Sequence, residues 1–141
     1  MTKKEIVLAA LAPAKTSEHS PVQVQKLLFL IDANLASTLG GPFFSFKPYH
    51  YGPFDKGVYE ALEELASEGL VEICLDRHWK SYRLTEAGER KALEIFENLP
   101  ANARDYISKV SAFVRHTTFS QLVSSIYKAY PEMRKNSVFQ D

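Results

Sequence analysis

LVEICLDRHWKSYRLTEAGE, residues 70–89, is the stretch that decides the fold. Two apolar and aromatic runs, 70–75 and 79–84, flank a short polar turn, and this pattern predicts a β-hairpin. Thr85 follows the second run directly and is a good helix N-cap, with acidic residues such as Glu89 in the first turn behind it. The stretch therefore predicts a hairpin that runs straight into a helix.

Three helices are predicted upstream of this hairpin. Apolar residues at helical spacing indicate the first over residues 3–12. Ser20, followed by proline, is a typical helix start, and the helix behind it is apolar on every side at 27–31, as in a helix at the centre of a domain. The third helix is capped by Asp55 and ends at Gly69, which suits a left-handed terminal residue.

The element order is helix, helix, connector, helix, β-hairpin, helix, which is the order of a winged helix-turn-helix. We therefore predict a mainly α (α+β) fold with a winged-helix domain at 1–99, whose wing is the two-stranded hairpin. Two further amphipathic helices form a C-terminal helical hairpin at 100–131, either within the same compact unit or as a dimerisation element. Residues 132–141 are expected to be a polar tail.

Composition excludes several classes of protein. Of 141 residues, 17 are Lys or Arg and 17 are Asp or Glu, so the chain lacks the strong positive charge of proteins that coat nucleic acid. No stretch approaches the roughly 20 apolar residues that cross a bilayer, and no signal peptide is recognisable, so we expect a cytoplasmic protein without membrane contact. The single cysteine, Cys74, lies between Ile73 and Leu75 and is expected to be buried.

The sequence contains no recognisable catalytic motif. Its four histidines (His19, His50, His78 and His116) lack the spacing of zinc ligands on a helix. A glycine-rich phosphate loop and a nucleophile elbow are also missing. We therefore expect a non-enzymatic protein with no catalytic residues, no metal and no cofactor.

Charge argues against reading of the DNA major groove by the third helix. Between Asp55 and Gly69 there are five acids and one base, and the core-facing residues Val58, Leu62 and Leu65 leave the acids outward. Phosphates would repel that face. The hairpin has the opposite character, because it carries a basic and aromatic strip that is the alternative, nucleic-acid-binding site. Its residues are Arg77, His78, Trp79, Lys80 and Arg83.

The connector at 43–54 (FFSFKPYHYGPF) is the most distinctive segment, and we expect it to form a short strand and a turn. It contains many aromatic residues around two turn prolines. Some of these rings are expected to complete the core and others to form a protein-binding surface. The candidate partner-binding residues come from this connector and the acidic helix behind it. They are Phe46, Tyr49, His50, Tyr51, Asp55, Tyr59, Glu60 and Glu64.

Three segments carry a family resemblance: residues 25–30 (QKLLFL), 46–53 (FKPYHYGP) and 58–62 (VYEAL). They resemble the Panacea (SocA-like antitoxin) domain, whose pattern runs Lys-Leu-Leu-Tyr, Tyr-Gly-Pro and Val-Tyr, over roughly residues 20–70. A weaker likeness to the winged-helix regulators of the MarR and PadR families covers residues 82–89 (YRLTEAGE).

The Panacea resemblance implies a non-enzymatic antitoxin that binds and neutralises a partner toxin, or an adaptor that delivers the toxin to a protease. Within its motif, Tyr51, Gly52, Pro53 and Tyr59 are expected first of all to define the fold. The alternative is a transcriptional regulator that contacts double-stranded DNA through its basic wing. A homodimer, formed through the C-terminal helices, is compatible with both.

Overall fold

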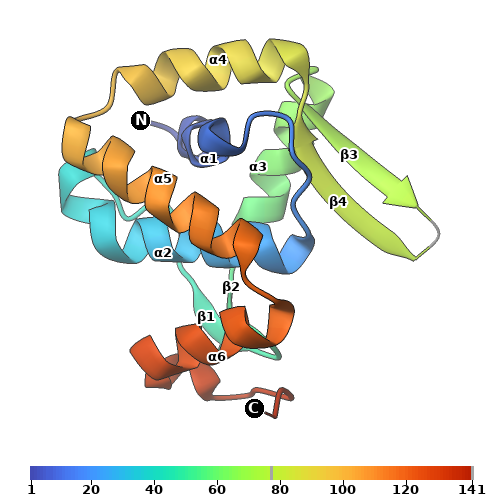
Figure 1. Cartoon of the computed structure of the whole chain (residues 1–141), viewed down its shortest axis with the longest axis vertical. Coiled ribbons are helices and arrows are strands. Elements are labelled where there is room, and N and C mark those ends of the chain that lie inside the picture. Colours follow the sequence, from blue (N-terminus) through green and yellow to red (C-terminus); the bar gives the residue numbers. More distant parts are fainter. Residues whose placement is uncertain (77, 141) are drawn as a thin grey trace.

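The computed structural model describes residues 1–76 and 78–140, and it confirms a mainly helical α+β chain (Figure 1). The helices are α1 (Lys3–Leu11), α2 (Pro21–Leu39), α3 (Lys56–Ser67), α4 (Glu86–Glu97), α5 (Ala101–His116) and α6 (Phe119–Ala129). Short 3₁₀ helices cover Ala12–Ala14 and Pro131–Arg134. Two antiparallel hairpins, β1 (Lys47–Tyr49) with β2 (Gly52–Phe54) and β3 (Val71–Asp76) with β4 (Trp79–Leu84), complete the described fold. Within the described residues, no helix combines the length and apolarity needed to cross a membrane.

The predicted helix ends are confirmed where a capping residue marks them. Ser20 and Thr118 each form a complete capping box with a glutamine three residues later. Asp55 and Thr85 accept hydrogen bonds from the first-turn backbone of α3 and α4. Gly69 has φ of 78°, the left-handed conformation expected after α3. These local signals fix where the helices begin and end before any tertiary packing is considered.

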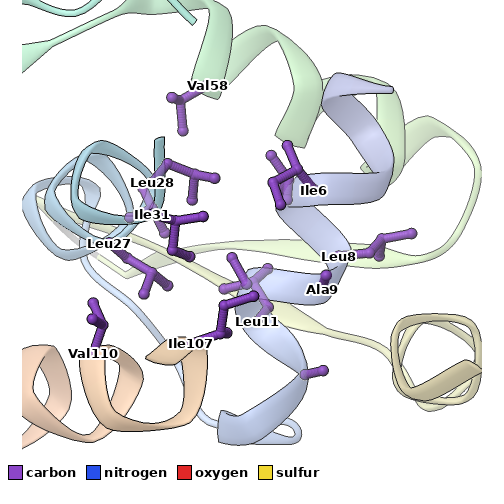
Figure 2. Packing of buried hydrophobic residues seen from close by; sticks show 14 of the residues in the cluster. Ile6, Leu8, Ala9, Leu11, Leu27, Leu28, Ile31, Val58, Ile107 and Val110 are labelled. Carbon is purple, nitrogen blue, oxygen red and sulfur yellow. The ribbon is translucent and has the colours of Figure 1, made fainter. Parts of the chain in front are cut away.

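Helix α2 lies at the centre of the core. Its Leu27, Leu28 and Ile31 are almost completely buried, and Figure 2 shows them facing Ile6 of α1 and Ile107 of α5 across one apolar interior. Burial of side chains of this size contributes about 1.5–3 kcal/mol each. The helix that the sequence predicts to be apolar on every side is therefore covered by other helices, as expected.

The two C-terminal helices belong to the same compact unit as the rest of the chain. Helix α5 packs along α2, and α6 lies beside β2 (Figure 1). Their apolar residues Ile107, Leu122 and Ile126 enter the common core, whereas Phe113 of α5 and Phe119 of α6 remain 40% and 46% exposed. The segment predicted to be a polar tail also returns to the body, since the Val138 N–H donates to the carbonyl of His50 at 2.9 Å.

The β3–β4 hairpin is buried at its base and exposed at its tip. Val71 pairs with Leu84 and Ile73 with Tyr82 near the helices, whereas Leu75 lies towards the tip and is 78% exposed. The prediction that Cys74 is buried is wrong: its side chain is partly exposed and its thiol donates to Glu72. The predicted pair of strands is confirmed, but the hairpin projects beyond the helices, so the core does not cover its outer residues (Figure 1).

His19 fastens this hairpin to the start of α2. Its backbone exchanges two hydrogen bonds with Tyr82, N–H to O at 2.8 Å and 2.9 Å. The side chain is 1% exposed, and neither ring nitrogen has a hydrogen-bond partner in the described structure. Burial lowers the pKa of His19 to about 4, and the nearby Arg115 acts in the same direction, while the Ser17 backbone offsets part of the shift. The imidazole is therefore neutral in the folded chain.

This buried histidine predicts a loss of stability in mild acid. The unfolded chain binds a proton near the ordinary histidine pKa of 6.5, while the folded chain resists it down to about 4, so stability falls as pH falls through that window. The loss from this one group is about 3 kcal/mol. We expect His19→Phe to flatten the pH dependence of the urea midpoint between these values.

His116 provides the matched control because it is exposed on the last turn of α5. The variant His116→Phe should keep the wild-type pH dependence. Equal pH profiles for the two variants would contradict the role assigned to His19.

Candidate partner-binding site

The connector folds as a second, smaller hairpin rather than the single strand and turn expected from sequence. Lys47 pairs with Phe54 and Tyr49 with Gly52, in an antiparallel register. The turn at this end requires φ of 103° at Gly52, a region that favours glycine. We refer to residues 47–54 as the connector hairpin. It extends from α2 towards α6, away from the β3–β4 hairpin (Figure 1).

Polar side chains of the buried helix α2 hold the two ends of the connector. At its start, the Asp32 carboxylate accepts the backbone N–H groups of Phe43 and Phe44 at 2.7 and 3.0 Å. At its end, the Gln25 amide donates to the Asp55 carbonyl at 2.9 Å and accepts the Asp55 N–H at 3.0 Å. Bonds to a charged group are among the stronger ones, so the connector is anchored.

The third polar side chain of this helix, Lys26, supports the turn itself. Its ammonium donates to the carbonyl of Pro53 at 3.1 Å, and the residue is 3% exposed. The α-carbon of Gly52 approaches so closely that a Cβ there would lie 3.3 Å from Cε of Lys26. Burial lowers the pKa of Lys26 to about 8. Glycine at position 52 thus serves both the positive φ and the close packing over Lys26.

The aromatic side chains form a continuous series from the connector hairpin to β4. Tyr49 stacks on His50 with ring centroids 4.1 Å apart and contacts Phe54 at 5.1 Å. Phe54 meets Tyr59 of α3 edge-on at 5.7 Å, and Tyr59 stacks on Tyr82 at 6.0 Å. Such pairs add about 0.5–1.5 kcal/mol beyond burial. The series links the connector, α3 and the β3–β4 hairpin mechanically.

Two cavities flank the connector hairpin and share Tyr49 and Phe54 as walls. The smaller, about 180 Å³, has Lys26 and Gln25 among its lining residues together with Tyr51. The larger, about 420 Å³, lies beside Lys47 and Asp55. The surface around the connector hairpin is therefore uneven, with exposed aromatic rings between two cavities.

The predicted partner-binding residues separate into three groups. Tyr49, His50 and Tyr51 are exposed at the tip, and Glu60 and Glu64 are exposed on α3. Phe46 is half-buried against Phe29 at 5.5 Å, and Tyr59 is half-buried between its aromatic neighbours. The carboxylate of Asp55 is occupied, because it accepts the backbone N–H groups of Gly57 and Ser45 at 2.7 and 2.6 Å. Five of the eight side chains are thus presented to solvent.

The acidic surface of α3 is also present as expected. Val58, Leu62 and Leu65 face the core with at most 1% exposure. Glu60, Glu63 and Glu64 are exposed. Part of this charge is balanced from α1, because the Lys4 ammonium lies 2.5 Å from Glu68 and 3.9 Å from Glu64.

The β3–β4 hairpin carries the alternative, nucleic-acid-binding residues. Arg77 lies outside the described residues. Arg83 pairs with Glu72 at 2.7 Å on the neighbouring strand, which neutralises one of the predicted cations. Trp79 is 78% exposed and His78 and Lys80 are exposed, while Tyr82 is the aromatic that packs inward. Among the described residues of this hairpin, the tip thus presents the Trp79 ring with His78 and Lys80, while Arg83 is paired with Glu72.

Sequence reasoning missed the anchoring roles of Gln25, Lys26 and Asp32. A signal was present in the sequence, since all three are polar residues next to the apolar run 27–31 of a helix that is predicted to be buried. Buried polar groups need partners, so these positions mark where other backbone meets the helix. Their partners could not be read from the sequence, because they lie in a connector without regular periodicity.

Comparison with known proteins gave no relative: no protein-family model matches the chain, and no significantly similar curated protein or solved structure was found. Within residues 1–76 and 78–140, no three His, Cys, Asp or Glu side chains gather as metal ligands. The function must therefore be inferred from the site itself.

The geometry predicts that Asp55 stabilises the fold rather than contacting a partner. Asp55→Ala removes an N-cap and the anchor of Ser45, and it should lower the free energy of unfolding by about 2 kcal/mol. Glu60→Ala, an exposed change on the same helix, should remain within about 0.5 kcal/mol of wild type. Urea denaturation followed by circular dichroism measures both. An Asp55→Ala midpoint equal to that of wild type would contradict the assignment.

Proposed function

We propose that this chain is a non-enzymatic protein-interaction module that resembles the Panacea (SocA-like antitoxin) domain and binds a partner protein, such as a toxin. Its contact surface would be the tip of the connector hairpin together with the acidic face of α3. We also propose a winged-helix architecture, with α3 in the recognition-helix position and β3–β4 as the wing. The His19–Tyr82 bridge, which joins the wing to the segment before α2, supports this architecture.

The observation that carries the functional proposal is the exposure of two tyrosines on an anchored turn. Tyr49 and Tyr51 are 48% and 42% exposed, although the connector beneath them is held by buried hydrogen bonds from α2. Tyrosine is enriched at interface hot spots because it buries a large area while losing little side-chain freedom. A rigid support reduces the entropy lost on binding.

The acidic face of α3 favours a protein partner over the DNA major groove. Glu60, Glu63 and Glu64 point outward, and phosphate would be repelled there. A partner with a basic surface would instead be steered towards it. The motif residues Gly52, Pro53 and Tyr59 contribute differently, since Gly52 and Pro53 are buried and Tyr59 donates to the Pro21 carbonyl at 3.4 Å.

The test uses the protein encoded by the adjoining reading frame as the first partner. We expect the two purified proteins to form a complex, and Tyr49→Ser combined with Tyr51→Ser to weaken its affinity by more than about tenfold. Glu60→Lys with Glu64→Lys should slow association and reduce its salt dependence. Isothermal titration calorimetry and stopped-flow mixing measure these two effects.

The matched control is Glu94→Lys with Glu97→Lys. Both glutamates are exposed on α4, at the opposite end of the molecule from the connector hairpin (Figure 1), and the change in charge is the same. This variant should bind like wild type. A missing complex, or one that the tyrosine and α3 variants leave intact, would contradict the proposal.

The second candidate function is a DNA-binding regulator that uses its wing. The observation that favours it is the exposure of Trp79 beside Lys80 at the hairpin tip. Here Arg77→Ala with Lys80→Ala should reduce affinity for duplex DNA and flatten its salt dependence between about 50 and 200 mM. Fluorescence anisotropy with upstream-region and random duplexes tests this. A wild-type protein without salt-sensitive binding would rule it out.

A further inference from the structure

Lys26 is a buried cation whose charge has no counter-ion in the described structure. Ion pairs there join Lys4 and Arg83 to carboxylates on neighbouring elements, and Arg90 and Lys109 to carboxylates four residues earlier on the same helix. None involves Lys26. Its ammonium has three N–H donors, and the Pro53 carbonyl accepts one of them at 3.1 Å. A buried charge in this condition is costly, which is why such groups are normally paired.

The cavity beside this lysine has the composition of a ligand site. It measures about 180 Å³ and is walled by aromatic rings, including Tyr49, Tyr51, Phe54 and Tyr59. Drug-sized ligands occupy about 300 Å³ or more, so the space suits a smaller molecule or a single residue of a peptide. Apolar walls around one fixed charge are the usual arrangement of a small-molecule site.

We propose that this cavity binds a carboxylate whose negative group pairs with the Lys26 ammonium and whose apolar body lies between the tyrosine rings. One buried lysine matches the single charge of a carboxylate. Phosphate recognition usually adds an arginine fork or a helix N-terminus, and among the lining residues only His50 adds a further basic group. Lys26 remains largely protonated at neutral pH, since burial lowers its pKa only to about 8.

The carboxylate has two possible sources, a free small acid or the C-terminus of a protein. The site shares Tyr49 and Tyr51 with the partner surface proposed above, but its recognition of charge depends on Lys26, which lies beneath the turn and is 3% exposed. Acid binding that Lys26→Met removes therefore tests this site separately from the loss of a protein complex in the tyrosine variants.

The experiment titrates the full-length protein with matched acids and amides, followed by ¹H–¹⁵N correlation spectra. Benzoate is compared with benzamide, and a pentapeptide ending in a free phenylalanine carboxylate with the same peptide amide. We expect at least one acid to bind tenfold or more tightly than its amide, with shifts at residues 49–54 and on α2. Tighter binding of benzoate indicates a free acid, and tighter binding of the peptide indicates a protein C-terminus.

The variant Lys26→Met removes the charge while retaining the length of the side chain, and it should reduce acid binding to the level of the amide. Lys47→Met, at an exposed position on strand β1 of the connector hairpin, is the control and should bind like wild type. Equal affinity of acid and amide for the wild-type protein would overturn the proposal whether or not Lys26→Met folds. Preference for inorganic phosphate over both acids would also overturn it.

Discussion

The structure depends on hydrogen bonds that run from buried polar side chains of α2 to the backbone of the connector and of Asp55 directly after it. Residues 24–29 of α2 are all buried, although some residues in its second half are exposed, and the helix carries Gln25, Lys26 and Asp32 with at most 8% exposure. Each satisfies backbone groups of the connector that would otherwise lose water without replacement. Without these bonds the connector would have no fixed path, and the tyrosines at its tip would have no fixed position.

The same arrangement couples the parts of the molecule that the proposed functions use. The backbone N–H of Asp55 donates to the Gln25 side chain, and the Asp55 carboxylate caps α3. The acidic helix therefore begins where the connector is anchored. The aromatic series continues through Tyr59 to Tyr82, whose backbone pairs with His19. A surface that binds at the connector hairpin is therefore in mechanical contact with the β3–β4 hairpin. This contact is a physical basis for combining the proposed partner binding with the proposed DNA contact of the β3–β4 hairpin.

The proposed carboxylate site also depends on the buried polar side chains of α2. Of the three buried polar side chains on α2, Gln25 and Asp32 have complementary partners, and Lys26 retains unused donors beside an open cavity. In a low-dielectric interior, an unpaired ammonium is the group with the most to gain from a ligand. The aromatic walls limit that ligand in size and favour an apolar body.

Local chemistry in the sequence determined the helices, their caps and the β3–β4 hairpin. Serine, threonine or aspartate at a cap, glycine at a left-handed position and alternating strand residues act on their immediate neighbours, so the residues at Ser20, Gly69 and Thr85 suffice to locate ends. The helical spacing of the apolar residues in α3 also indicated which side of that helix is acidic. The apolar side faces the core, so the acidic residues between them face outward.

Tertiary structure decided which of the candidate residues are available. Asp55 and Glu60 are both acidic residues near the start of α3, but the backbone N–H groups of Ser45 and Gly57 occupy the carboxylate of Asp55, whereas Glu60 is exposed. Cys74 and Leu75 have the pattern of buried strand residues, yet the hairpin extends past the helices that would cover them. The connector hairpin pairs within itself, but its position against the core depends on hydrogen bonds from Gln25, Lys26 and Asp32 of α2. Such hydrogen bonds depend on segments far apart in the chain, and no local pattern records them.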